Sequence, residues 1–266
     1  MDVTAADDDG WTPDWPVPAS VGAWCSTRRG GTSPPPWDSL NLGDHVGDDP
    51  ARVAANRARF AQRLEGARPV YLQQVHGVRC LGLEPGGSDA DAPEVADASV
   101  TRHPGLACTV MVADCLPVLL CNRRGDAVGA AHAGWRGLAA GVVERAVQSL
   151  QALADDPAGE VLAWLGPCIG PGAFEVGDEV RQAFVSADAG ARSAFRPADR
   201  AGHWLADLPA LARRRLASMG VGSVHGNDGS AAWCTVTQSA RFFSHRRDAV
   251  RLGASGRFAA AVWRRR

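Results

Sequence analysis

The sequence predicts a mixed α/β (α+β) fold, a single-domain layered sandwich of mixed sheets flanked by helices. Two observations support this prediction. Apolar runs typical of buried strands mix with amphipathic stretches of helical periodicity, without the strict alternation of a parallel α/β protein. The 266 residues are 45% hydrophobic, which is enough for one large core, and no fixed-period repeat divides them.

The N-terminal part is expected to contain little regular structure. Residues 1–18 are acidic and rich in proline, so they are predicted to be a disordered tail in front of a domain at 19–266. Residues 22–27 are expected to form a short strand.

A long segment that is dense in Gly, Pro, Asp and Ser follows at 27–50, and no regular element fits it. Its embedded Trp37, Leu40 and Leu42 indicate an ordered loop rather than a disordered one. Asp49 and Pro50 then provide the start signals of a helix that ends near Gly66.

The central part reads as strands, with one helix. Residues 70–77 are expected to be a strand followed by a turn, and 106–122 two buried strands, or one bent strand, around ADCLP. Residues 127–137 indicate a strand that enters a glycine-rich turn, 138–153 an amphipathic helix, and 161–171 a buried strand.

The C-terminal part mixes both kinds of element. Helices are expected from about 174–184 and at 205–219, and SVHGNDGS indicates the end of a strand. The segment 241–263 is expected to hold a basic turn and a final strand.

Composition excludes several functional classes. The formal net charge is -1, without the basic excess of a nucleic-acid binder. All 28 basic residues other than histidine are arginine, so no lysine is available for a Schiff base or a Walker-type motif. The sequence has neither a secretory signal nor an apolar run long enough for a membrane span. Seven cysteines at scattered spacings suggest a reduced, cytoplasmic protein rather than a disulfide scaffold.

Three residues stand out as candidates for chemistry. His76 in QVHG, Cys115 in VADCLP and His132 in AAHAGWRG are each expected at the end of a buried apolar strand, beside Gly or Pro. Two His and one Cys would leave a zinc ion one open position, as in catalytic zinc sites. The spacings alone do not bring them together, and a buried inert thiol is the commoner role for a residue such as Cys115.

Nine motifs occur in a fixed order and carry a family resemblance. They are TRRGG, SLNLGDHVGDDP, QQVHG, ADASVT, VADCLPVLL, AAHAGWRG, WLGPCIGP, FEVG and FFSHRRD. Over about residues 24–257 the chain resembles the YfiH family, also called the laccase-domain or polyphenol oxidase family. It departs from the usual family pattern at His245 and Ser255, where Tyr and Thr are more common.

The resemblance implies a fold comparable to that of cysteine hydrolases and a metal, zinc, on His76, Cys115 and His132. It also implies phosphorolysis of adenosine, inosine, guanosine and methylthioadenosine, and deamination of adenosine. The expected partners are therefore a purine nucleoside and phosphate, with no nucleic acid and no membrane. Copper (Cu²⁺) would also bind a His–Cys–His set in vitro, but the seven His are mostly isolated and fit a multicopper oxidase poorly.

Further residues are candidates for substrate binding or for support of the site. Arg28 and Arg136, beside glycine turns, are expected to hold the phosphate, with a structural salt bridge as the equal alternative. Asp114 is expected to orient a ligand His or to act as a general base. Asn41 and Gln74 are candidates to bind ribose or base, although Asn41 also suits a turn.

A second tier of residues has a structural role as its commoner interpretation. Arg246 and Arg247 form a basic pair for which a structural salt bridge is favoured. Asp97 is expected to cap a turn or approach the site. Trp135 and Phe243 are candidates to stack on a purine, with core packing as the default.

Two alternatives to the phosphorylase remain open at this point. In the first, Cys115 is the nucleophile of an amide hydrolase that edits peptidoglycan precursors, with His76 or His132 as its base. In the second, the chain is a metal-binding partner protein without activity. A monomer is expected in either case.

Overall fold

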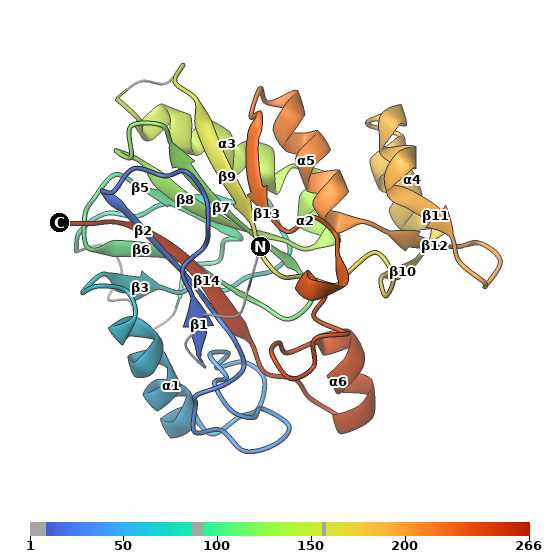
Figure 1. Cartoon of the computed structure of the whole chain (residues 1–266), viewed down its shortest axis with the longest axis horizontal. Helices are drawn as coiled ribbons and strands as arrows, with labels where there is room; N and C mark the ends of the chain where they lie inside the picture. Colours follow the sequence, from blue (N-terminus) through green and yellow to red (C-terminus); the bar gives the residue numbers. More distant parts are fainter. Residues whose placement is uncertain (1–8, 87–92, 156–157) are drawn as a thin grey trace.

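Two β-sheets stacked face to face form the centre of the computed structural model, which describes residues 9–86, 93–155 and 158–266 (Figure 1). The five-stranded sheet has the order β1 (Gly10–Trp11), β2 (Val21–Ser26), β14 (Phe258–Arg264), β6 (Leu106–Val112) and β3 (Arg68–Val70). The six-stranded sheet has the order β13 (Ser223–Gly226), β9 (Val161–Leu165), β7 (Leu116–Asn122), β8 (Val128–Ala133), β5 (Ala98–Thr101) and β4 (Cys80–Gly82). Both sheets are mixed, as predicted: β14 is antiparallel to β2 and β6 while β3 is parallel to β6, and β7 is antiparallel to β8 and β9 while β13 is parallel to β9.

Alternation along the strands divides the core into layers. In β7, Leu116, Val118 and Leu120 belong to the apolar cluster on the helix-covered face. Leu119 and Cys121 point the other way and belong to the cluster between the two sheets. Because successive side chains of a strand point to opposite faces, one apolar run of this kind fills two core layers at once.

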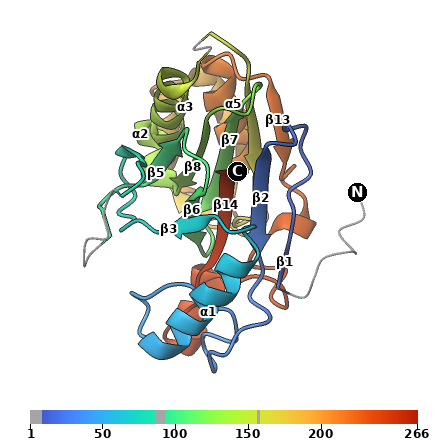
Figure 2. The ribbon, with the colours of Figure 1, turned by 90° about the vertical axis from the view of Figure 1, so that its left-hand side faces the viewer.

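Helices close the outer faces of the sandwich. Helices α2 (Trp135–Ala140), α3 (Val142–Leu153) and α5 (Leu208–Ser218) cover the six-stranded sheet, and their apolar residues join its outer cluster. Helix α1 (Pro50–Gln62) lies on the other side of the molecule, against the five-stranded sheet (Figures 1 and 2). The arrangement is the layered sandwich that the sequence predicted.

A small third sheet projects beside the sandwich, at the right of Figure 1. Its strands are β10 (Glu175–Gly177), β12 (His203–Ala206) and β11 (Phe195–Pro197), accompanied by helix α4 (Asp178–Val185). Helix α6 (His245–Leu252) and the short 3-10 helices Ala189–Ala194 and Ala231–Trp233 complete the described elements.

The first residues of the described chain differ from the expected disordered tail. β1 pairs with β2, with Gly10 opposite Ser26, and Trp15 is only 8% exposed. Residues 9–18 are thus held by a strand pairing and by apolar packing that composition does not reveal. The remainder of the predicted tail, 1–8, lies outside the described residues.

Three predicted elements are also corrected. Most of 70–77 is irregular rather than a strand, since β3 ends at Val70. The helix expected at 138–153 is divided at Gly141, whose φ of 102° ends α2 and starts α3. The expected basic turn is helix α6, which begins at Ser244, whose side chain accepts a hydrogen bond from the Arg247 amide. Among the described helices, none is both long and apolar enough to cross a bilayer.

Candidate metal centre

His76, Cys115 and His132 meet at one point of the structure. Their candidate ligand atoms all lie within 4.8 Å of one another, and Cys115 Sγ is 3.5 Å from His76 Nε2. The two imidazole rings are 4.8 Å apart in an edge-on arrangement. His132 is buried, Cys115 is half-buried and His76 is exposed, so the cluster opens to one side. The convergence that spacing alone did not establish is therefore present.

His76 is held in an unusual backbone conformation. Its φ is 62°, in the left-handed region that L-residues other than glycine rarely adopt. The carboxylate of Asp97 accepts the backbone N–H groups of Val75, His76 and Gly77, at 3.2, 2.8 and 2.7 Å. Successive N–H groups that converge on one anion form a nest. The buried anion of Asp97 thus offsets the strain at His76 and fixes the direction of its side chain.

Asp97 also orients the second histidine. Its Oδ1 lies 2.8 Å from His132 Nδ1, and both side chains are buried. This contact keeps a proton on Nδ1 and directs Nε2 towards the cluster, where it can bind a metal once it gives up its own proton. The sequence suggested Asp114 for this orienting role, and the structure assigns it to Asp97.

Cys115 lies where the chain passes from one sheet to the other. It follows β6 of the five-stranded sheet and directly precedes β7 of the six-stranded sheet. Its neighbour Asp114 has a φ of 93°, a second left-handed residue at the site. Of the three candidates, only His132 lies within a strand, so the expectation that all three end strands is wrong for His76 and Cys115.

Gly134 leaves room for the cluster. A Cβ at this position would lie 2.5 Å from His76 Cδ2 and 2.9 Å from Cys115 Sγ. Both distances are shorter than van der Waals contact, so any larger residue would push the two ligands apart. The glycine in AAHAGWRG is thus explained by the close approach of backbone and side chains.

The electrostatics of the cluster favour a thiolate beside an imidazolium. Burial alone would raise the pKa of Cys115, but the charge of His132 and hydrogen bonds from both histidines outweigh it and lower the pKa to about 6. Burial would lower the pKa of His132, yet the charge of Cys115 and the hydrogen bond to Asp97 raise it to about 9. A thiolate is the form of cysteine that binds a metal or attacks an electrophile.

One ligand pair of the cluster has the spacing of a zinc site, and the three ligand atoms lie within 4.8 Å of one another. Tetrahedral zinc binds sulfur at about 2.3 Å and nitrogen at about 2.0–2.1 Å, which holds the two atoms about 3.6 Å apart. The observed separation of Cys115 Sγ and His76 Nε2 is 3.5 Å. Three protein ligands and an open side correspond to a catalytic rather than a structural zinc site.

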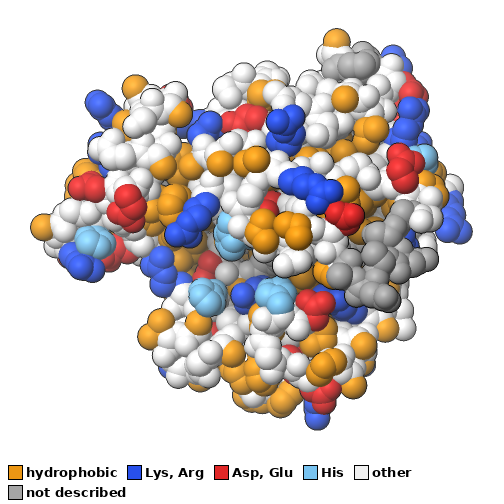
Figure 3. Space-filling model, turned by 180° about the vertical axis from the view of Figure 1, so that it is seen from behind, with side chains coloured by type: hydrophobic (Ala, Val, Ile, Leu, Met, Phe, Trp, Pro, Cys, Tyr) orange, Lys and Arg blue, Asp and Glu red, His pale blue; other side chains and the backbone are white. Residues whose placement is uncertain are grey.

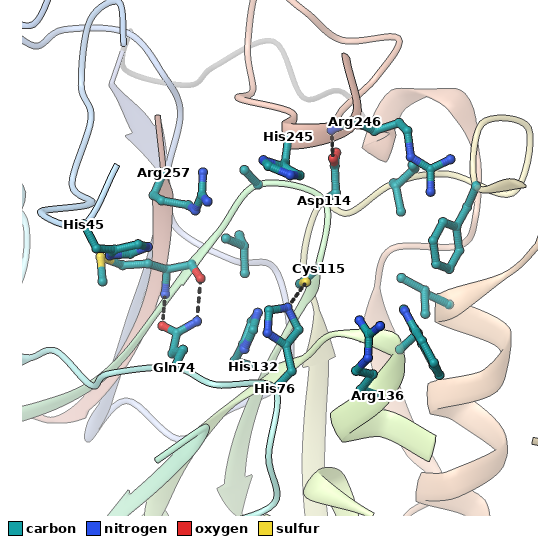
Figure 4. A pocket seen from close by; sticks show the side chains of 17 residues that line it. His45, Gln74, His76, Asp114, Cys115, His132, Arg136, His245, Arg246 and Arg257 are labelled. Atoms are coloured by element: carbon teal, nitrogen blue, oxygen red, sulfur yellow. Dashed lines mark hydrogen bonds between the residues drawn. The ribbon is translucent and has the colours of Figure 1, made fainter. Parts of the chain in front are cut away.

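The cluster forms part of the wall of a cleft of about 300 Å³ (Figure 4). The face seen in Figure 3 is hollowed, with histidine and arginine side chains around the hollow. The cleft is lined by three arginines and by two histidines outside the cluster: Arg136, Arg246, Arg257, His45 and His245. Its volume is at the lower end of the range of about 300–1,000 Å³ for ligand clefts.

The expected residues Arg136, Gln74 and Asp114 all line this cleft. Arg136 stacks on Trp135, with its guanidinium carbon 4.5 Å from the ring centroid. The side-chain amide of Gln74 accepts a hydrogen bond from the Met111 N–H at 2.8 Å and donates one to the Met111 carbonyl at 2.7 Å, so both of its polar atoms already have protein partners. Among the described residues that line the cleft, Asp114 carries the only carboxylate.

Asp114 has both oxygens engaged. They accept the hydroxyl of Thr235 at 2.5 Å and the backbone N–H of Arg246 at 2.6 Å. Asp114 therefore ties the 3-10 helix region and α6 to the loop that carries Cys115, which is a supporting role.

Arg28 and Asn41 do not line the cleft. Arg28 bonds Asp38 through its Nε and Nη2 and lies over the ring of Phe243, 4.6 Å from the centroid. Asn41 is fully buried, and its Oδ1 accepts the backbone N–H groups of Gly43 and Arg257. Arg28 and Asn41 therefore have structural roles in place of the expected contacts with phosphate and ribose, because their polar groups form hydrogen bonds within the protein.

The second tier of candidates divides in the same way. Arg246 and Trp135 line the cleft, while Arg247 is bound to Asp248 and to backbone carbonyls. Phe243 is fully buried in the core. Arg247 and Phe243 therefore have structural contacts, whereas Arg246 faces the cleft and also donates to the Glu175 carbonyl.

Among the charged and polar lining residues, three were not singled out by the sequence as binding residues. His45, His245 and Arg257 belong to the motifs SLNLGDHVGDDP, FFSHRRD and SGR, far apart in the chain. The local signals that could have indicated them were Gly256 before Arg257, and Gly43 and Gly47 on the two sides of His45.

The fold and the site define a class, an α/β double-sheet sandwich with a single His–Cys–His centre in an arginine-lined cleft. The sequence model described as "Multi-copper polyphenol oxidoreductase laccase" matches residues 22–265. The chain belongs to this family, the one that the motifs indicated.

Curated relatives and solved structures agree with this assignment. The chain is 54% identical over 254 residues to a purine nucleoside phosphorylase of Pseudomonas aeruginosa, with 95% of this chain and 97% of the relative covered. It is 51% identical over 252 residues to the purine nucleoside phosphorylase YfiH of Escherichia coli, with coverages of 94% and 97%. A crystal structure of a Neisseria meningitidis protein of the family DUF152 superimposes with a TM-score of 0.85 at 42% identity, over 97% of this chain and all of that one.

Proposed function

We propose that this chain is a zinc-dependent purine nucleoside phosphorylase that acts on adenosine, inosine, guanosine and methylthioadenosine and also deaminates adenosine. The observation that carries the proposal is the combination in one cleft of a His–Cys–His centre and arginines that have no carboxylate partner among the described residues. The names of the curated relatives support the phosphorylase part of it.

The arginines of the cleft are suited to a phosphate. Within 9–86, 93–155 and 158–266, the guanidinium groups of Arg136, Arg246 and Arg257 form no ion pair, whereas Arg57 and Arg215 outside the cleft do. A guanidinium binds phosphate oxygens through two parallel hydrogen bonds. An anionic substrate would neutralise charge that the protein leaves unpaired.

The apolar part of the cleft lining is suited to a purine base. Ile169, Phe174, Leu208 and Trp135 line it, and the first three are at most 7% exposed. Apolar and aromatic surface of this kind holds a flat base and keeps water from the sugar.

The proposed reaction takes place between the phosphate and the nucleoside bound in this cleft. A phosphate oxygen forms a bond to the anomeric carbon while the bond from that carbon to the purine nitrogen breaks. The purine leaves with the electron pair and takes up a proton. His76, Cys115 and His132 would hold zinc, which supplies a Lewis acid beside the reacting oxygen atoms. An arginine of the cleft holds the phosphate in line with the sugar, which supplies the proximity that the reaction needs.

Product analysis tests the proposal directly. Protein stripped by a chelator and reloaded with one equivalent of zinc is incubated with inosine, with and without phosphate. We expect hypoxanthine and ribose 1-phosphate only when both zinc and phosphate are present. Unchanged inosine in every mixture refutes the phosphorylase. Release of inosine and ammonia from adenosine without phosphate tests the deaminase separately.

Cys115→Ser tests the centre itself. We expect this variant to lose bound zinc, measured by atomic emission, together with phosphorolysis. Cys80→Ser is the matched control, because Cys80 is a half-buried thiol in β4 away from the cleft. Loss of turnover with full zinc content in Cys115→Ser would show that the thiol is not a ligand.

A second candidate function rests on the alignment of Asp97, His132 and Cys115. A carboxylate that holds the imidazole, which in turn lowers the pKa of a thiol to about 6, is the arrangement of a cysteine hydrolase. In that case metal-free protein would cleave the amide of a nucleotide-linked amino-sugar peptide, and zinc would inhibit it. Cleavage that requires zinc, or none at all, argues against the hydrolase. No comparable observation favours a multicopper oxidase, since the described residues contain one group of three metal-type side chains.

A further inference from the structure

The two sides of the cleft differ in chemistry, which bears on where each substrate binds. In Figure 4, Cys115 lies at the middle, with His45 and Arg257 on one side of it and Arg136 on the other. The side with Arg136 and Arg246 also holds the aromatic rings of Trp135 and Phe174, on which these arginines lie. The cleft is therefore polarised along its length, with the metal centre between its two ends.

Arg257 is fixed in place without being neutralised. Its Nη1 donates to the carbonyls of Ser255 and Gly256, at 2.9 and 3.1 Å. In the part of the chain that the structure describes, no carboxylate bonds to it. Burial lowers the pKa of Arg257, and the charges of Cys115 and Asp114 act in the opposite direction. An arginine stays protonated even so, so the side chain is a partly buried cation that can bind an anion.

The loop that follows Ser39 is built around Arg257. Asn41 Oδ1 accepts the backbone N–H of Arg257 at 2.9 Å, and the Leu42 N–H donates to the Arg257 carbonyl at 2.9 Å. A Cβ on Gly43 would lie 2.8 Å from Arg257 Cγ. The same loop places His45 in the cleft. The fully buried Asn41 thus positions Arg257 from a point that lies 216 residues away in the chain.

The other two cleft arginines have part of their binding capacity occupied. Arg136 stacks on Trp135 at 4.5 Å. Arg246 lies over Phe174 at 5.6 Å, and its Nη1 donates to the carbonyl of Glu175 at 3.2 Å. Both guanidinium groups belong to the aromatic end, where a planar cation and a ring together make a stacking surface.

We propose that Arg257, with His45 and His245 beside it, is the subsite for inorganic phosphate, and that the end with Phe174 and Arg246 receives the base. The assignment rests on the proposed phosphorylase function and divides its two substrates between the ends of the cleft. His76 and Cys115 then lie between phosphate and base, where the sugar must be.

Binding measurements on metal-free protein test the assignment without any need for turnover. Titration calorimetry with inorganic phosphate, and separately with inosine, is carried out on wild type, Arg257→Met and Arg246→Met. We expect Arg257→Met to weaken phosphate binding about tenfold or more and to leave inosine binding within about twofold. Arg246→Met should show the reverse order. Equal phosphate affinity in wild type and Arg257→Met, or a greater loss in Arg246→Met, overturns the proposal.

Two further variants protect the test against misfolding of Arg257→Met. Arg257→Lys keeps the charge and should restore part of the phosphate affinity. Gly43→Ala keeps Arg257 but displaces its stem, so it should weaken phosphate binding, whereas Gly222→Ala should not. Gly222 is the matched control because a Cβ there meets nothing within 4 Å. Unchanged phosphate affinity in Gly43→Ala overturns the positioning role of the loop.

Competition distinguishes the sources of the phosphate and separates this proposal from the function on which it rests. Inosine 5′-monophosphate should not displace inorganic phosphate from wild type, and displacement would show that the subsite takes a phosphate carried by the nucleoside. If phosphate binding depends on Arg257 but the protein does not phosphorolyse inosine, the proposed function is refuted and the phosphate subsite is still supported.

Discussion

Asp97→Asn is the substitution with the most specific expected result, because one carboxylate serves four donors. Oδ1 faces the His76 N–H and His132 Nδ1, and Oδ2 faces the N–H groups of Val75 and Gly77. An asparagine has one acceptor and one donor at these positions, so two donors must face its NH₂ group.

The expected effect on stability follows from this count. Each buried donor left without a partner costs about 1–3 kcal/mol, so the free energy of unfolding should fall by about 2–6 kcal/mol. The effect on the metal is separate. If the NH₂ group faces His132 Nδ1, the ring proton moves to Nε2, and the lone pair that points to the metal centre is lost. Removal of such a supporting partner lowers metal affinity about 10–100-fold.

The assay combines urea unfolding with zinc competition against an indicator dye. Asp248→Asn is the control, because Asp248 is also a buried carboxylate, 1% exposed, and is bound to Arg247 away from the metal ligands. We expect both variants to be destabilised and only Asp97→Asn to lose zinc affinity. Wild-type zinc affinity in Asp97→Asn would refute the orienting role of this carboxylate.

Three further predictions concern the thiol and two glycines. In metal-free protein, the rate of Cys115 alkylation, read by mass spectrometry, should be half-maximal near pH 6, because the pKa of the thiol is lowered and the thiolate persists to lower pH. His132→Gln should move this midpoint to higher pH. A rate that rises only above about pH 8 in wild type would contradict the prediction. Gly134→Ala should abolish stoichiometric zinc binding while the far-ultraviolet spectrum stays native, since its Cβ would overlap the ligand side chains; normal zinc content would contradict the crowding argument. Gly141→Ala should lower the free energy of unfolding by about 1–2 kcal/mol, because a φ of 102° disfavours any Cβ, and zinc affinity should not change; an unfolding midpoint equal to that of wild type would disprove the strain.

Much of the fold follows from local sequence. The start of α1 at Pro50 is specified by Asp49, whose side chain accepts the Ala51 amide. The two buried strands around ADCLP follow from their Val and Leu content and from the turn between them. Signals of this kind act within a few residues, which is why they can be read from the sequence.

The support of the site depends on contacts that local sequence does not encode. The role of Asp97 requires the left-handed backbone at His76, which arises only once the carboxylate is in place. The placement of Arg257 depends on Asn41 at the other end of the chain. The ligands His76, Cys115 and His132 were identifiable as chemical types, but their meeting point is a property of the tertiary structure.

The connections between the two sheets carry two of the three metal ligands. His76 lies on the connection from β3 to β4, and Cys115 lies on the connection from β6 to β7, each of which leaves the five-stranded sheet for the six-stranded one. Neither sheet by itself therefore contains the centre. A metal ion bound to His76, Cys115 and His132 would therefore cross-link both of these connections to β8 and resist separation of the two sheets.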